Sequence, residues 1–386
     1  MSDVVIVGVG MIPVGEHWDV SLRSLAARAA LAAVRDAGGL KPQAIYIGNV
    51  LAPVVSHQAN LGAMVADNLG MRGVEGTTVE AAGASGGAAL RQGILAVTSG
   101  LVDVAMVLGV EKVTDQVGAG IEEALSQTLD ADYEAMHGMT LAAQAALVMQ
   151  RYLEDYDAPR DAFAGFALTA HAHAVHNPYA MYRRAIDLET YRNAPLVSDP
   201  LNLYDVAPYA DGAAAVIITR LENAPRGLDH PLVRISGSSV VIDTLALHDR
   251  DDPLAFRAAG YSAERACRQA GILPRDVDFL ELHDAFSVYA AISLEAAGFA
   301  PRGQGWKLGQ DRHIGRDGDL PVNTFGGMKA RGYPIGAAGV YQAVEAALQL
   351  RGQAGECQVP GARIALIQSL GGPASTAAAH VLERMD

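Results

Sequence analysis

The feature that most constrains the fold is a repeated order of short β-branched runs and longer stretches rich in alanine and leucine. Strands that alternate with helices in this way are typical of α/β proteins. The second half of the chain repeats the order of the first, so the sequence predicts two tandem β/α repeats. Strands are expected in the first half at residues 4–9, 44–50, 78–81, 103–110 and 213–219, with helices at 22–37, 59–69 and 86–98. Strands are expected in the second half at residues 232–241, 277–282, 363–368 and 377–382, with helices at 253–270, 288–297 and 339–350.

A long segment between the two repeats has a different character. Residues 112–209 begin with polar sequence and continue with two helical stretches, 140–156 and 161–176, the second of which is stopped by Asn177-Pro178. A long excursion from a layered core usually serves as a lid or a substrate wall. We therefore expect three parts: a first half made of residues 1–111 plus 210–220, an inserted loop domain 112–209, and a second half 221–386.

Composition and charge exclude several classes of protein. The formal net charge is −14, whereas a nucleic-acid partner calls for clustered lysine and arginine. The two cysteines, Cys267 and Cys357, are too few for a disulfide framework and have no metal-ligand spacing. The N-terminus lacks the basic region of a signal peptide, and no apolar run reaches the roughly 18 residues of a membrane span. We expect a cytoplasmic protein without a nucleic-acid partner, a membrane anchor, a metal or a redox cofactor.

Four motifs follow one another along the chain, and together they carry a family resemblance. They are Val79–Gly87, His283-Asp284-Ala285-Phe286, the glycine-rich tract Asn323–Gly339, and Ser369-Leu370-Gly371-Gly372. Their order and spacing resemble the thiolase superfamily, in particular its archaeal-type and sterol-carrier-protein-type branch, over essentially the whole chain. The resemblance implies the thiolase fold, in which two tandem β/α repeats form a layered α-β-α-β-α core with a loop-domain insertion.

The resemblance also implies a ligand and partners. The substrate would be an acyl-CoA, with coenzyme A as part of the substrate and no separate cofactor. A homodimer would form through the edge of the first-half sheet. In this branch a small OB-fold protein of the DUF35 type is a further expected partner, and the inserted segment would set the acyl chain.

The chain departs from the family at the positions that carry acyl transfer. A thiolase uses a cysteine thiolate at a helix N-terminus, where the helix dipole lowers the thiol pKa, and a histidine of a Gly-His-Pro tract that takes the thiol proton. Gly83 stands in place of the cysteine, and Tyr333 in place of the histidine. Ser369 replaces a second cysteine of many members, and Ala285 replaces one that the sterol-carrier branch can have. The nearby Ser85 is interpreted as a helix cap rather than a nucleophile.

The groups with which the family stabilises negative charge do have matching residues in this chain. His283 matches the side chain that holds an oxyanion-hole water, and the backbone N–H of Gly371 matches part of a second hole. Tyr333 is a candidate acid/base group, although it could simply fill the space of a histidine. His137 lies where the family's insertion lines the pocket and is a candidate acid/base or substrate contact.

Glycines of the third motif complete the candidate site. They let the chain pass close to a thioester, and with Ser369 they are the expected substrate-binding residues: Gly326, Gly327 and Gly336. Asn323 is expected to have a structural role, bonding the loop backbone. The histidines His171, His173 and His176 do not converge on one helical face, so we expect no metal site there.

Three functions are compatible with this pattern. The first is an enzyme that cleaves or forms a carbon–carbon bond of an acyl-CoA by aldol or retro-aldol chemistry, without a covalent acyl-cysteine. Thiolase-like aldolases of steroid side-chain degradation share the tyrosine at position 333 but carry a tyrosine where this chain has His283. The second is a non-catalytic acyl-CoA-binding or scaffolding subunit. The third is an acetyl-CoA acetyltransferase whose nucleophile was mutated. The intact glycine tracts and His283 favour the first.

Overall fold

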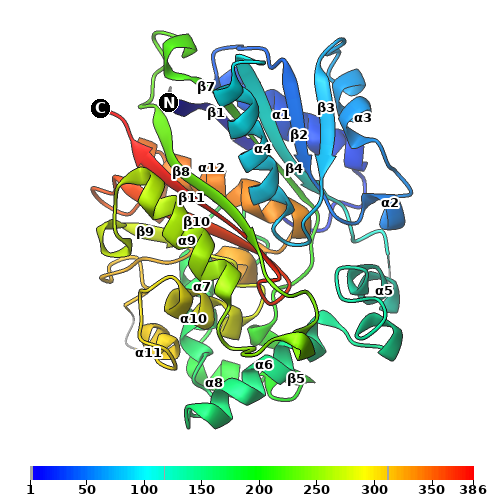
Figure 1. The fold of residues 1–386 in the computed structure, drawn as a ribbon, viewed down its shortest axis with the longest axis vertical. Helices are drawn as coiled ribbons and strands as arrows, with labels where there is room; N and C mark the ends of the chain where they lie inside the picture. Colours follow the sequence, from blue (N-terminus) through cyan, green and yellow to red (C-terminus); the bar gives the residue numbers. More distant parts are fainter. Residues whose placement is uncertain (1–2, 117, 311–312) are drawn as a thin grey trace.

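A single mixed sheet runs through the molecule. The structure is a computed structural model that describes residues 3–116, 118–310 and 313–386. In this part of the chain nine strands pair in the order β3-β2-β4-β7-β1-β8-β11-β10-β9 (Figure 1). The first-half strands are β1 (Val4–Met11), β2 (Ala44–Gly48), β3 (Glu75–Val79), β4 (Val104–Glu111) and β7 (Gly212–Arg220). The second-half strands are β8 (Val233–Ile242), β9 (Phe279–Glu281), β10 (Ile364–Gly371) and β11 (Thr376–Arg384).

The strand pairing shows the predicted tandem repeat directly. Strands β1 and β8 pair with each other at the middle of the sheet, and outward from them the two halves follow the same scheme. Each middle strand pairs antiparallel with β7 or β11, which pairs antiparallel with β4 or β10. Strands β2 and β9 then add in parallel. Only β3 lacks a counterpart among the described residues of the second half.

Helices complete the layers. Helix α1 (Leu22–Asp36) packs on β1, β7 and β4 of the first half, and α9 (Arg257–Ala270) packs on β8 and β11 of the second. Helices α4 (Ser85–Ser99) and α12 (Ala338–Arg351) contact each other and strands of both halves. The strands of the two halves thus form two layers of the continuous sheet, with α4 and α12 between them and α1 and α9 outside, in the α-β-α-β-α order that the family resemblance implies.

The inserted segment contains α5 (Ala119–Ser126), α6 (Leu141–Asp155), α7 (Ala164–Ala174) and α8 (Leu188–Arg192), and the small sheet of β5 (Leu196–Ser198) and β6 (Leu201–Asn202). Helix α6 begins where predicted because the Thr140 side chain accepts a hydrogen bond from Ala143 N, 3.1 Å away. Helices α6 and α7 pack on the second half, against α10 (Ser287–Ala296) and α11 (Gly305–Gln310) (Figure 1). The division of the chain into three parts remains a prediction.

Short elements connect these layers. The remaining α-helices are α2 (Ala52–Val55) and α3 (Leu61–Asn68). A π-helix, η6, spans Gly327–Arg331. The 3-10 turns are η1 (Ala135–His137), η2 (Leu203–Asp205), η3 (Leu221–Asn223), η4 (Leu247–Asp249), η5 (Pro274–Asp276), η7 (Ile335–Ala337) and η8 (Gly355–Cys357). No helix in the described ranges combines the length and apolarity that crossing a membrane requires.

Some predicted boundaries were wrong. The strand expected at residues 78–81 is β3, which begins at Glu75 and ends at Val79, before the motif itself. Its first residues were not predicted as strand because the Gly-Thr-Thr sequence is exposed and contains no apolar residue. The helix expected from residue 253 begins at Arg257, because Phe256 before it has a left-handed backbone with φ of 40°.

Candidate active site

The turn before α4 brings Gly83 to the ends of distant strands. His283 follows β9, and Leu370 lies near the end of β10; because these two strands are parallel neighbours, their carboxyl ends share one edge of the sheet. A Cβ atom placed on Gly83 would lie 2.5 Å from Tyr333 Oη, 2.5 Å from Leu370 O and 2.8 Å from His283 Cε1. Three motifs thus meet at Gly83, and the room for a side chain there is filled.

Tyr333 and His283 face each other in this cluster. Tyr333 Oη lies 3.4 Å from His283 Nε2, and the two rings are nearly perpendicular, at 89° with centroids 5.4 Å apart. Both residues are buried. At this separation the contact is a long hydrogen bond, one that a reacting group between or beside the two atoms could replace.

Burial keeps both groups uncharged. Burial, together with a smaller contribution from the nearby Arg331 cation, lowers the pKa of His283 to about 3. It also raises the pKa of Tyr333, to which the Glu111 carboxylate adds. When the neutral Tyr333 hydroxyl donates to His283 Nε2, the imidazole proton lies on Nδ1, a buried atom with no hydrogen-bond partner among the described residues. That donor is available to a ligand or a water.

Residues on either side of His283 fix its position. Leu282 N donates to Asn323 Oδ1 at 2.7 Å, and Met328 N donates to Asp284 Oδ1 at 2.7 Å. The structural role expected for Asn323 is confirmed by this bond to the loop backbone. Both bonds tie the His283 segment to the glycine-rich tract that also carries Tyr333.

Residues around the turn at Gly83 have mixed roles. Ser85 Oγ accepts from Ala81 N at 2.9 Å and donates to Ala82 O at 2.6 Å, so it braces the turn. A Cβ on Gly371 would lie 2.8 Å from Ala81 O, which places the Gly371 backbone directly against the same turn. Ser369 Oγ is buried between α4 and α12, without a hydrogen-bond partner in the described ranges.

The three glycines expected to approach a substrate contact protein atoms in the structure. Gly326 has φ of 102°, and a Cβ on it would lie 2.5 Å from the Ala174 Cβ of α7. A Cβ on Gly327 would collide with the Asp284 carboxylate. One on Gly336 would lie 2.9 Å from Glu111 Oε2. Packing within the protein is enough to require glycine here, and contact with a thioester stays a prediction.

His137 is not brought into the cluster. Its side chain is exposed on η1. The buried position of that turn belongs to Glu134, whose Oε1 accepts from Gln144 Nε2 and from Leu247 N, each at 2.9 Å. His137 therefore does not join Gly83, Tyr333 and His283, and its role as an acid/base group or substrate contact stays a prediction.

Two residues of the site were missed in the sequence. Tyr209 packs on Tyr333, with ring centroids 6.1 Å apart, and the adjoining Pro208 O accepts from Tyr333 N at 2.9 Å. Glu111 is a fully buried carboxylate at the end of β4. Its place at the end of an apolar strand was visible in the sequence, but nothing there showed which donors would surround it.

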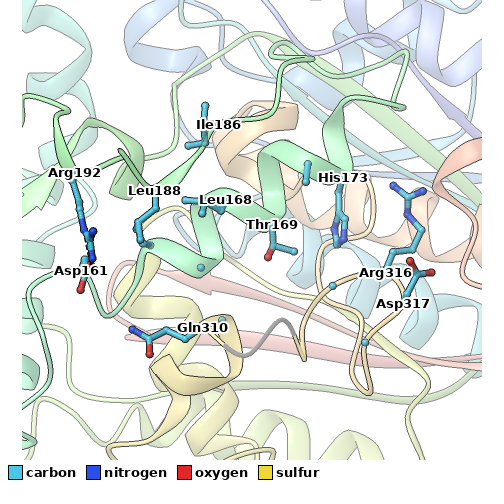
Figure 2. A pocket seen from close by; sticks show the side chains of 16 residues that line it. Asp161, Leu168, Thr169, His173, Ile186, Leu188, Arg192, Gln310, Arg316 and Asp317 are labelled. Carbon is cyan, nitrogen blue, oxygen red and sulfur yellow. Dashed lines mark hydrogen bonds and ion pairs between the residues drawn. The ribbon is translucent and has the colours of Figure 1, made fainter. Parts of the chain in front are cut away.

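A large cavity lies away from this cluster. About 960 Å³ in volume, it runs along α7 between α8 and α11, and none of the candidate residues lines it (Figure 2). His173 and Arg316 stand at one end, and Asp161 pairs with Arg192 at the other (Figure 2). His173 Nδ1 lies 3.1 Å from Asn323 O, so the wall of this cavity touches the backbone of the glycine-rich tract.

A smaller cavity adjoins the site. It has a volume of about 510 Å³ and lies between α6 and the segment 247–253, with Met139, Gln144, Leu147 and Leu247 in its wall. A Cβ on Gly372 would be 3.9 Å from Gln144 Oε1, so the inner wall of this cavity reaches the Gly371-Gly372 turn. In the described ranges no group of three or more His, Cys, Asp or Glu side chains is placed to hold a metal.

Family models match both halves of the chain. Residues 4–222 match the family described as thiolase, N-terminal domain, and residues 239–384 match thiolase C-terminal domain-like. Both repeats seen in the fold therefore have a counterpart in one family.

Proteins that are similar in sequence point to the same family. The acetyl-CoA acetyltransferase of Methanothermobacter thermautotrophicus is 40% identical over 386 residues, which cover 100% of both chains. Benzoylsuccinyl-CoA thiolase subunit BbsB of Thauera aromatica is 33% identical, over 96% of this chain and 94% of the relative. Sterol carrier protein 2 of Bos taurus is 30% identical, over 79% of this chain and 58% of the relative.

Solved structures show the same fold. The structure of an Ltp2-ChsH2(DUF35) aldolase superposes with a TM-score of 0.85 at 24% identity, over 99% of this chain and 98% of that one. Acetyl-CoA acetyltransferase from Syntrophomonas wolfei superposes with a TM-score of 0.73 at 18% identity, over 100% of both. With the family models and the full-length relative, these matches show that the chain belongs to the thiolase superfamily.

Proposed function

We propose that this thiolase-superfamily protein forms or cleaves a carbon–carbon bond of an acyl-CoA by aldol or retro-aldol chemistry, without an acyl-cysteine. The observation that carries the proposal is the filled space at Gly83. Tyr333 Oη and the Leu370 carbonyl both lie within 2.5 Å of where a Cβ would be, so no nucleophilic side chain fits. The same tyrosine, at the position of the thiolase base, faces His283, and the two side chains make a proton-transfer pair beside the position of the missing nucleophile.

The pair can serve a retro-aldol step on a β-hydroxyacyl-CoA. Tyr333 Oη takes the proton of the β-hydroxyl while its own proton passes to His283 Nε2. The β-carbon becomes a carbonyl, the Cα–Cβ bond breaks, and its electron pair moves into a thioester enolate. The Gly371 N–H and the His283 Nδ1–H are the candidate donors to the enolate oxygen. Return of the proton to Cα releases a shorter acyl-CoA and an aldehyde or ketone.

Electrostatics favours a transient charge in this site. Burial disfavours an isolated imidazolium, as the low pKa of His283 shows. An enolate formed beside it would supply the missing counter-charge, so the charged pair is more stable than either charge alone. The reaction therefore needs no permanent charge in the pocket.

The cavity between α6 and segment 247–253 is the proposed entrance for the acyl-CoA. Its wall includes apolar side chains from Met139, Leu147 and Val148, which suit a pantetheine arm or an acyl chain. It ends near the Gly371-Gly372 turn, where the thioester would have to lie. The acyl chain itself would be set by the inserted segment.

Two partnerships are part of the proposal. The exposed edge strand β3, residues Glu75–Val79, would pair with a second copy of the chain. An OB-fold protein of the DUF35 type would bind as well. Support for this partner comes from the similar Ltp2-ChsH2(DUF35) aldolase, whose name includes DUF35, and from the name of BbsB as a thiolase subunit.

The test is Tyr333→Phe, assayed on a panel of β-hydroxyacyl-CoAs with mass-spectrometric detection of the shorter acyl-CoA. Loss of the hydroxyl should lower turnover by about a hundredfold or more. Acyl-CoA affinity, measured by calorimetry, should stay within about twofold because the ring still fills the same space. Tyr261→Phe changes a tyrosine exposed on α9 and is the matched control. Turnover that survives in the Tyr333 variant would remove this residue from the mechanism.

A second candidate is a non-catalytic acyl-CoA-binding or scaffolding subunit. The absent nucleophile and the uncharged Tyr333–His283 pair are compatible with it. This candidate predicts acyl-CoA binding without turnover of any panel member, even with a DUF35-type protein added. The third alternative, a mutated acetyltransferase, is disfavoured because the backbone carbonyl of Leu370 also occupies the space at Gly83.

A further inference from the structure

Glu111 is a buried carboxylate that the proposed reaction does not use. It is the last residue of β4, and no part of it reaches solvent. Its Oε1 accepts from Asn49 Nδ2 at 2.7 Å and Leu51 N at 3.0 Å. Its Oε2 accepts from Val50 N and Gly336 N, both at 3.0 Å. All of these donors are uncharged, so hydrogen bonds alone hold this carboxyl group in place.

The donors come from two different parts of the fold. Asn49, Val50 and Leu51 follow β2, the parallel neighbour of β4, whereas Gly336 belongs to the tract that carries Tyr333. A Cβ on Gly336 would lie 2.9 Å from Asn49 Cα, so the tract is pressed directly onto the end of β2. The carboxylate therefore joins the Tyr333 tract to the first-half sheet.

The tract between Tyr333 and Gly336 is strained. Ile335 has a positive φ of 29°, which a β-branched residue adopts only when its surroundings enforce it. On one side the tract is held by Pro208 O and Ala210 N, which bond the Tyr333 backbone at 2.9 and 3.1 Å. On the other side it is held by the bond from Gly336 N to Glu111. These two attachments fix the stretch that sets where the Tyr333 ring points.

We propose that Glu111 is a positioning residue for Tyr333. By accepting the Gly336 N–H while bound to the end of β2, it holds the strained tract in the conformation that aims Tyr333 Oη at Gly83 and His283. The effect on turnover rests on the function proposed above, whereas the effect on the tract does not. A pocket without a nucleophile depends on such positioning, because a displacement of about 1 Å can cost a hundredfold in rate.

The first test is hydrogen exchange, which requires no turnover. Glu111→Gln keeps the shape but puts an N–H₂ group against one of the two pairs of donors, Asn49 Nδ2 with Leu51 N or Val50 N with Gly336 N. Amides of residues 333–339 should then exchange about tenfold faster than in the unchanged protein. The matched control is Glu295→Gln, which alters a carboxylate that accepts from Gly303 N at 2.9 Å and Gly305 N at 2.7 Å in a loop outside the site. That variant should speed exchange at 303–305 and leave 333–339 unchanged.

The second test is a double-mutant cycle on turnover. Glu111→Gln alone should lower kcat by about tenfold to a hundredfold with KM nearly unchanged, and Glu295→Gln should stay within about twofold. In a Tyr333→Phe background, Glu111→Gln should lower kcat by less than about a further twofold. Glu111 acts on turnover only by positioning the hydroxyl that this background lacks. A merely structural role would instead give additive losses, and these would overturn the proposal.

The two tests separate the two proposals. Unchanged exchange at 333–339 in Glu111→Gln would overturn the positioning role whatever the enzyme does. Faster exchange with no turnover in any variant or in the unchanged protein would support the positioning role and reject the proposed function. If Glu111→Gln does not fold, Asn49→Ser removes one donor to Oε1 and should give the same changes at a smaller size, about threefold. Its failure to do so would count against the proposal.

Discussion

At the residue scale the informative feature is a pair of substitutions that fit each other. Gly83 removes the side chain that a thiolase needs, and Tyr333 occupies the space that this side chain would take. His283, the third member, remains buried and neutral beside them. The loss at position 83 and the change at position 333 are therefore one sterically coupled change rather than two independent ones.

Gly83→Cys is expected to destabilise the protein and not to restore thiolysis. Its Cβ would meet Tyr333 Oη and Leu370 O at 2.5 Å, and overpacking of this kind typically costs about 1–3 kcal/mol. Urea denaturation measures the free energy of unfolding, and acetoacetyl-CoA with free CoA tests thiolysis. Gly15→Cys is the control, because a Cβ there has no neighbour within 4 Å.

The double variant Gly83→Cys/Tyr333→His extends this experiment. It should regain part of the lost stability, since the phenol hydroxyl is gone while the Leu370 carbonyl remains. Equal stability of the single and double variants would show that the Tyr333 contact does not limit what fits at position 83.

At the element scale, the π-helix η6 determines how the glycine-rich tract reaches the site. Gly326 and Gly327 both have positive φ, and the helix that follows packs against α7. Lys329 and Arg331 are buried within it; Lys329 Nζ donates to Asp205 O at 2.7 Å, and Arg331 forms a 2.6 Å ion pair with Glu345. A removed partner would leave a buried charge, so these contacts specify one position for the tract.

Gly327→Ala should cost more than Gly355→Ala. Both glycines have similar positive φ, 54° and 56°, so the strain of about 1–2 kcal/mol for a left-handed alanine is shared. Only at Gly327 does the new Cβ collide with the Asp284 carboxylate; at Gly355 it finds open space. Chemical denaturation should show a further loss of about 1–3 kcal/mol for Gly327→Ala. Equal losses of stability in the two variants would mean that the Asp284 side chain moves aside without destabilising the protein.

The edge strand β3 is the element that the proposed dimer depends on. It is exposed along most of its length and pairs on one side only in the described structure. Thr77→Lys with Thr78→Lys should halve the molecular mass measured by light scattering after gel filtration, because charged lysines block edge-to-edge pairing. Leu101→Lys, on a residue 86% exposed elsewhere, is the control. A dimer that persists in the β3 variant would place the interface on another surface.

At the scale of the whole molecule, burial of histidines links stability to pH. The pKa is lowered to about 4 for His173 and to about 3 for His283 and His380, in each case mainly by desolvation. Between these values and about 6.5 the unfolded chain binds protons that the folded chain does not, so stability falls as the pH falls through this window. Glu111, with a pKa raised to about 7, acts in the opposite direction.

Burial also raises the pKa of Asp205, Glu281, Asp284 and Glu345, which act in the same direction as Glu111, so the histidine contribution is isolated by substituting a histidine. Each buried histidine contributes a slope of up to about 1.4 kcal/mol per pH unit within the window. In urea denaturation between about pH 8 and pH 5, the free energy of unfolding of the unchanged protein should decrease relative to that of His283→Gln as the pH falls. His137→Gln, which changes an exposed histidine, should leave the slope as it is. A slope unaffected by His283→Gln would mean that this imidazole becomes protonated in the folded protein.

The sequence by itself determined the fold class, the tandem repeat and the family. The periodicity of apolar residues predicted the first two, and the order and spacing of short motifs indicated the family. The sequence also showed which chemistry is missing, since Gly83 has no side chain in any conformation. The bounds predicted for β3 were wrong because most of this strand is exposed, and a strand without an apolar face carries no periodic signal.

Only the tertiary structure decided what the remaining residues do. It placed Tyr333 Oη against His283 and in the space above Gly83, turned His137 to the surface because Glu134 took the buried side of the turn, and surrounded Glu111 with donors from two distant segments. These outcomes depend on distances of about 3 Å between residues far apart in the chain. Periodicity reports which face of an element is buried, but the packing of whole layers sets which side chains meet there.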